Sequence, residues 1–126
     1  MNTIEQAKKL LESSDIEQAK KLLLDMAEST PDDVSVWILL CGIATRTQDW
    51  ELGAISFGRL VKLRPASSLA TSGLVQSYVN LDRHEEAMGE IERFRLASDL
   101  DSEEAQIVMD EHKRVEELIL KRGKPA

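Results

Sequence analysis

The side chains of this sequence that could take part in covalent or metal chemistry are few. The chain contains one cysteine, Cys41, and two histidines, His84 and His112. The histidines lack the spacing of a helical metal-binding pair, so we expect both to be solvated. Cys41 lies within an apolar stretch, where a lone thiol usually serves as a small packing residue. These residues predict no catalytic site, no metal site and no cofactor.

The charge and hydropathy of the chain argue against two kinds of binding partner, nucleic acids and the membrane interior. Acidic residues number 23 and basic residues 16, which gives a net charge of −7. A field of this sign repels the phosphate backbone of nucleic acids. The longest strongly apolar stretch, 36–44, is shorter than the roughly 20 residues that a membrane-spanning helix requires. The polar start of the sequence does not resemble a secretory signal. We therefore expect a cytoplasmic protein that neither binds nucleic acid nor inserts into a membrane, with self-association left open.

An interval of 34 residues recurs along the chain. It separates Pro31 from Pro65, and it also relates small and large apolar positions to one another. The positions that keep their type are Asp15 and Asp49; Ala19, Gly53 and Ala87; Leu23, Phe57 and Ile91; and Met26, Leu60 and Phe94. Such an interval is typical of stacked units, each of which buries its apolar face only against its neighbours.

Helices must position these repeated residues. Within a unit, the small residue and the large residues four and seven positions later share one helix face, because a turn contains 3.6 residues. First helices are expected at 3–12, 35–46 and 68–80, and polar turns that can cap the second helices at 13–15, 47–49 and 80–82. A final helix is expected at 103–122, with its inward side formed by Ala105, Val108, Met109, Val115, Leu118 and Ile119.

These positions resemble the tetratricopeptide repeat, whose 34-residue pattern joins a Trp-x2-Leu-Gly-x2-Tyr first helix to an Ala-x3-Phe second helix and a proline. The middle unit matches at Trp37, Leu40, Gly53, Phe57 and Pro65. The third matches at Leu74, Tyr78, Ala87 and Ile91, and the first at Ala7, Leu10, Ala19, Leu23 and Pro31. The resemblance implies one all-α domain over residues 1–122, a right-handed solenoid of three helical hairpins (1–33, 34–67 and 68–101) plus a capping helix (102–122), and a frayed tail at 123–126.

The resemblance also implies a concave groove, lined by the first helix of each hairpin, that binds a peptide or an amphipathic helix of another protein. The groove positions that carry over are Ile4, Lys8, Leu11, Ser35, Ile38, Gly42, Thr45, Leu69, Ser72, Gln76 and Val79. The apolar members are expected to form its floor. We therefore expect a non-enzymatic adaptor or specific chaperone. The alternative is an inhibitory, immunity-type or assembly subunit that binds its partner through its acidic surface.

Overall fold

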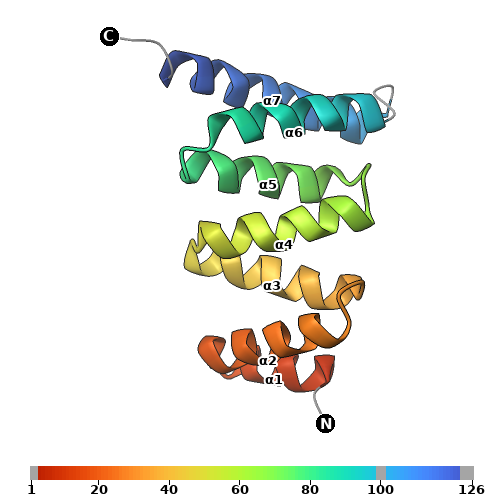
Figure 1. Ribbon diagram of the computed structural model, residues 1–126, viewed down its shortest axis with the longest axis vertical. Helices are drawn as coiled ribbons and strands as arrows, with labels where there is room; N and C mark the ends of the chain where they lie inside the picture. The colour runs from red at the N-terminus through yellow and green to blue at the C-terminus, as the bar shows by residue number, and fades with distance from the viewer. Residues whose placement is uncertain (1–2, 99–101, 123–126) are drawn as a thin grey trace.

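The protein is an all-helical chain in the computed structural model (Figure 1). The structure describes residues 3–98 and 102–122, without the side chains at positions 104, 107, 108, 111 and 122. No strand occurs in these described ranges, which confirms that the fold is all-α, the coarser part of the prediction. The helices within them are α1 (Ile4–Glu12), α2 (Ile16–Ser29), α3 (Val34–Thr47), α4 (Trp50–Leu63), α5 (Ser68–Asn80), α6 (His84–Ala97) and α7 (Glu103–Arg122).

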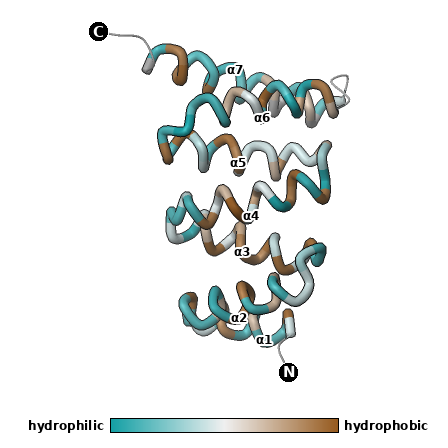
Figure 2. Tube along the Cα trace, in the orientation of Figure 1, coloured by the Kyte–Doolittle hydropathy of each residue, from teal (hydrophilic) through white to brown (hydrophobic). Residues whose placement is uncertain are grey.

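Consecutive helices pack against each other along the whole described chain. Each helix from α1 to α6 contacts the next one, and α7 contacts both α5 and α6. Figure 1 shows the helices stacked along the long axis, with α1 and α2 at one end and α6 and α7 at the other. The central helices α3, α4 and α5 are the most hydrophobic, and Figure 2 colours the trace by the hydropathy of each residue. Each of them also has more buried residues than α1, α2 or α6.

The second helix of each consecutive pair has a constant length and spacing. The helices α2, α4 and α6 each contain 14 residues, and they begin 34 residues apart, at positions 16, 50 and 84. The turn before each of them contains a residue with positive φ, which is Ser14, Gln48 or Asp82, again 34 residues apart. A left-handed residue ends one helix and lets the chain reverse. The 34-residue interval of the sequence therefore also recurs in the backbone conformation.

The predicted capping of the second helices is only partly correct. The Asp49 carboxylate accepts a hydrogen bond from the Leu52 amide at 3.1 Å, as expected of an N-cap. Asp15 stands at the N-cap of α2 but makes no such bond through its side chain. The N-cap of α6 is Arg83, because the left-handed backbone of Asp82 places that residue one position before the helix. The turn itself, with its reversed backbone, is the common feature of the three pairs.

The repeated small residues lie where helices approach closely. Ala19 and Ala87 are completely buried, and Gly53 is buried at the equivalent position of α4. A Cβ atom on Gly53 would lie 2.5 Å from the Ser77 Oγ atom, so this side of α4 leaves no room for a side chain opposite α5. The large residues of the same period, Leu23 and Ile91 among them, form the core. The small and large positions of the period thus have different packing roles.

The carbonyl oxygens of Pro31 and Pro65 each accept a hydrogen bond from a side chain of a later helix. The indole nitrogen of Trp37 donates to the Pro31 oxygen at 2.7 Å, and the Arg93 guanidinium donates to the Pro65 oxygen at 2.9 Å. Each proline follows the end of a second helix, where it stops further helical growth. Trp37 and Arg93 therefore stabilise the α2–α3 and α4–α5 connections, respectively.

Helix α7 packs with a face that differs from the predicted one. Ala105 and Ile119 are buried, as expected, and Met109 and Val115 are half-buried. Leu118 is 54% exposed, which contradicts its predicted inward position. The predicted Val108 position and the tail 123–126 lie outside the described side chains and residues. None of the described helices combines the length and apolar character needed to cross a bilayer.

Candidate functional site

A surface hollow beside α5 contains some of the residues that were predicted to line a groove. The hollow has a volume of about 390 Å³, which lies in the range of ligand sites in proteins. We call it the α5 hollow. Its lining comes from α3, α4, α5 and α7, namely Thr45, Phe57, Leu69, Ser72, Gly73, Val75, Gln76, Val79, Asn80, His112 and Val115.

The structure brings five of the predicted groove residues together in this hollow and places the other six elsewhere. Those in the hollow are Thr45, Leu69, Ser72, Gln76 and Val79. Ile4 and Leu11 are instead half-buried and pack against the hydrophobic core. The remaining ones, Lys8, Ser35, Ile38 and Gly42, are exposed on α1 and α3 outside the lining of the hollow.

The α5 hollow combines an apolar floor with uncharged polar groups. Leu69, which belongs to its lining, is 75% exposed. The described residues of its lining include no lysine, arginine or carboxylate. Among the polar groups, the Thr45 hydroxyl donates to the Cys41 carbonyl oxygen at 2.9 Å, and the Asn80 amide donates to the Gln76 carbonyl oxygen at 2.8 Å. The hollow therefore suits an apolar or neutral segment better than a charged one.

Phe57 reaches the hollow because α5 carries a glycine where the two helices meet. A Cβ atom on Gly73 would lie 2.2 Å from the Phe57 ring, a distance that real side chains do not adopt. Both residues are buried, and both line the hollow. The shape of the floor thus depends on Gly73 having no side chain.

We expect Gly73→Ala to destabilise the protein by about 1–2 kcal/mol. Overpacking costs roughly 1–3 kcal/mol, and the better helix propensity of alanine offsets part of it. The matched control is Gly89→Ala in α6, where a Cβ atom would meet nothing within 4 Å. That variant should gain about 0.5–1 kcal/mol. Urea denaturation of both variants measures the difference, and a Gly73→Ala protein as stable as Gly89→Ala would contradict the packing described above.

His112 is the lining residue that sequence reasoning misjudged most clearly. We expected a solvated histidine, but its side chain is only 1% exposed. Its ring packs edge-on against Phe94, with the ring centres 5.8 Å apart. The signal was present in the spacing, because His112 lies seven residues after Ala105 and seven before Ile119, both of which are buried. Two helical turns separate such residues, so all three share one face.

Cys41, Tyr78, Arg83 and Glu86 have shifted pKa values, and these four residues do not line the α5 hollow. Burial raises the pKa of the Cys41 thiol to about 12, so the thiolate needed for nucleophilic chemistry is scarce at neutral pH. Burial also raises the pKa of Tyr78. The hydrogen bonds between Arg83 and Glu86 raise the pKa of the guanidinium and lower that of the carboxyl. These shifts follow from packing and ion pairing, which are structural causes.

Comparisons with known proteins do not assign the chain to a family. No protein-family model matches the chain, and no curated protein matches its sequence.

Proposed function

We propose that the chain is a tetratricopeptide-type solenoid, made of three helical hairpins and a capping helix. The constant 34-residue spacing of α2, α4 and α6 supports this proposal, as does the left-handed residue in each preceding turn. The packing order supports it as well, because each helix contacts the next and α7 lies against the last pair. In such an array the first helices face one side and present their side chains to a partner.

The function that follows is protein binding by a cytoplasmic, non-enzymatic adaptor or specific chaperone. Its groove holds an apolar segment of a partner protein, most simply one face of an amphipathic helix. The observation that carries this proposal is the α5 hollow, where the exposed Leu69 stands beside an uncharged lining. A helix that places apolar residues three and four positions apart could fill such a hollow from one side.

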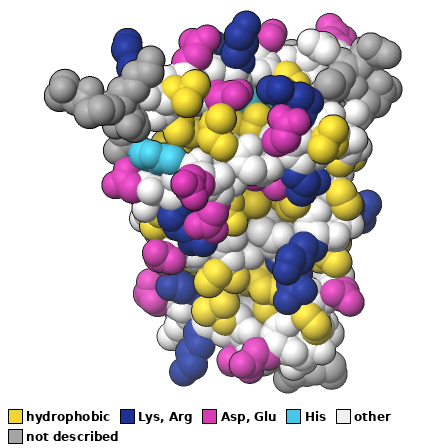
Figure 3. Space-filling model, turned by 45° about the horizontal axis from the view of Figure 1, so that its top comes forward, with side chains coloured by type: hydrophobic (Ala, Val, Ile, Leu, Met, Phe, Trp, Pro, Cys, Tyr) yellow, Lys and Arg dark blue, Asp and Glu magenta, His cyan; other side chains and the backbone are white. Residues whose placement is uncertain are grey.

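On the face that Figure 3 shows, the distribution of surface charge favours the hollow over an acidic surface as the binding site. Figure 3 shows one face of the protein, on which acidic and basic side chains alternate and hydrophobic side chains emerge in separate groups. A partner recognised mainly by charge would need a surface dominated by one sign. That face offers no such region among its described residues.

We expect Leu69→Asp to weaken partner binding at least tenfold without unfolding the protein. The side chain is largely exposed, so the substitution should leave the core intact, but it introduces a charge into an apolar contact. The ligand can be selected from a displayed library of random helical peptides, and its affinity measured by calorimetry. The matched control is Leu96→Asp, because Leu96 is 80% exposed on α6 and lies outside the hollow.

Two results would overturn the proposed site. One is a set of selected peptides that bind Leu69→Asp as tightly as the native protein. The other is a selection dominated by acidic or basic peptides without apolar residues at helical spacing, because the uncharged lining predicts the opposite preference.

A further inference from the structure

The first helical pair contains the same eight-residue sequence twice. Residues 4–11 and residues 16–23 both read Ile-Glu-Gln-Ala-Lys-Lys-Leu-Leu, twelve positions apart. The two copies have matching burial at most positions, with both alanines buried and both glutamines exposed. The two differences are at Lys8 and Lys20 and at Leu11 and Leu23, where α2 is the more buried copy and also contacts α3. The pair therefore repeats its own surface pattern.

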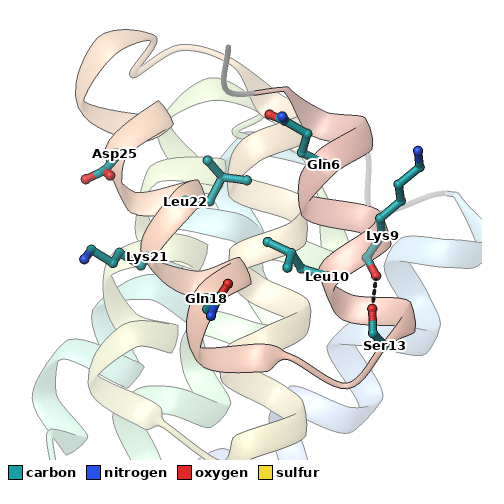
Figure 4. A pocket seen from close by; sticks show the side chains of 8 residues that line it. All are labelled: Gln6, Lys9, Leu10, Ser13, Gln18, Lys21, Leu22 and Asp25. Atoms are coloured by element: carbon teal, nitrogen blue, oxygen red, sulfur yellow. Dashed lines mark hydrogen bonds between the residues drawn. The ribbon is translucent and has the colours of Figure 1, made fainter.

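A hollow of about 670 Å³ lies between these two helices, and equivalent residues from both copies line it. Figure 4 shows Leu10 and Leu22 directed toward each other between the helices, with Lys9 and Lys21 on opposite sides. The lining is completed by the pairs Gln6 with Gln18 and Ser13 with Asp25, and the Ser13 hydroxyl donates to the Lys9 carbonyl oxygen at 2.7 Å. We call this site the N-terminal hollow. Two ammonium groups and one carboxylate flank its leucines, on a chain of net charge −7.

The opposite end of the protein offers a helix of complementary character. Helix α7 lies against α5 and α6, which shows that the end of a helical pair can accept one more helix. A further hollow lies along α7. Met109 and Leu120 line it, together with the carboxylates of Asp110, Glu116 and Glu117 and the basic groups of Arg95 and Lys113. Leu120 is 54% exposed and Met109 is half-buried. The lining of this hollow therefore carries one more carboxylate than basic groups around an exposed leucine.

We propose that the N-terminal hollow binds helix α7 of a second copy of this chain. Leu120 and Met109 of α7 would cover Leu10 and Leu22, and the α7 carboxylates would lie near Lys9 and Lys21, so the linings of the two hollows meet with opposite net charges. The two surfaces are different, so the contact is head-to-tail and leaves one free surface at each end of a dimer. Such contacts extend into open chains. A contact made by three helices is small, so the association is weak and concentration-dependent.

Sedimentation equilibrium from roughly 10 µM to 1 mM tests the proposal, since weak complexes populate in this range. The native protein should increase in average mass beyond that of a dimer, and added salt should reduce the increase. Lys9→Glu/Lys21→Glu and Asp110→Lys/Glu117→Lys should each be monomeric, because their mutated surface repels its native counterpart. An equimolar mixture of the two variants should associate again, because each reversed surface then meets a complementary one.

The matched control for Lys9→Glu/Lys21→Glu is Arg46→Glu/Lys62→Glu, which changes the net charge by the same amount at exposed positions of α3 and α4. It should associate like the native protein. Circular dichroism verifies that each variant is folded. A native protein that stays monomeric throughout the range would overturn the proposal. So would association that stops at a dimer, or that only the lysine substitutions reduce, because these results indicate a symmetric contact. None of these substitutions changes a residue that lines the α5 hollow, so the result does not bear on the function proposed for that hollow.

Discussion

Replacing Phe94 by alanine is expected to lower the free energy of unfolding by about 3–5 kcal/mol. Phe94 is the largest of the fully buried side chains, with an exposure of 1%. Its ring meets His112 edge-on, at an interplanar angle of 90°. Removing the ring leaves a cavity between α6 and α7, and it also removes an aromatic contact that holds α7 on the array. The substitution should therefore lower the local stability of α7 as well as the free energy of unfolding of the whole protein.

Two measurements check this expectation. Urea denaturation should show the fall in stability, and hydrogen exchange should show reduced protection of the α7 amides at a urea concentration where the native protein remains folded. Leu96→Ala is the matched control, because Leu96 lies two residues later on the same helix but is exposed, and its loss should be within about 0.5 kcal/mol. A Phe94→Ala loss below about 1 kcal/mol would mean that α7 is not held through this contact.

The second large effect is expected from Arg93→Met, with a loss of about 3 kcal/mol. Arg93 makes two hydrogen bonds of 2.7 Å with the Glu90 carboxylate. It also donates to the Thr71 hydroxyl at 3.1 Å and to the Pro65 carbonyl oxygen. Glu90 is only 7% exposed, so the substitution leaves a carboxylate buried without its cation. Arg93 is itself partly exposed, which places the expected loss at the lower end of the range for broken buried pairs.

A second ion pair, at the start of the same helix, tests the role of burial. Arg83 and Glu86 form a similar two-fold interaction, at 2.8 and 2.6 Å and three residues apart, but on the exposed surface. Arg83→Met should therefore destabilise the protein much less than Arg93→Met, as chemical denaturation can measure. The double variant Glu90→Leu/Arg93→Met should recover a large part of the loss, because it removes the stranded charge. Equal losses for Arg83→Met and Arg93→Met would show that the buried network does not stabilise the array.

The local architecture could be predicted because it depends on residues close in the sequence. The spacing of Ala19, Gly53 and Ala87, each followed four residues later by a large apolar residue, predicted amphipathic second helices, and the structure buries all of these positions. Pro31 and Pro65 indicated where those helices end. Helical periodicity and the stereochemistry of proline act over one or two turns, so one sequence is enough to see their effect.

The site could be predicted only in part, because its shape depends on contacts between distant helices. Thr45 and Val79 were expected in one groove and do line one hollow, but Phe57, Gly73 and His112 complete its floor unexpectedly. Only the packed structure reveals that Gly73 leaves space for the Phe57 ring.

The sequence by itself thus determined where helices form, where they end and how often they recur, since those properties follow from local backbone preference. The tertiary structure decided which side chains meet. Arg93 and Pro65 are 28 residues apart, and the hydrogen bond between them depends on how α6 packs against α5, because Pro65 lies in the connection that leads into α5. The same holds for the burial of His112, whose polar ring suggests an exposed position until Phe94 is placed beside it. Such contacts depend on the relative placement of whole helices, which local periodicity does not specify.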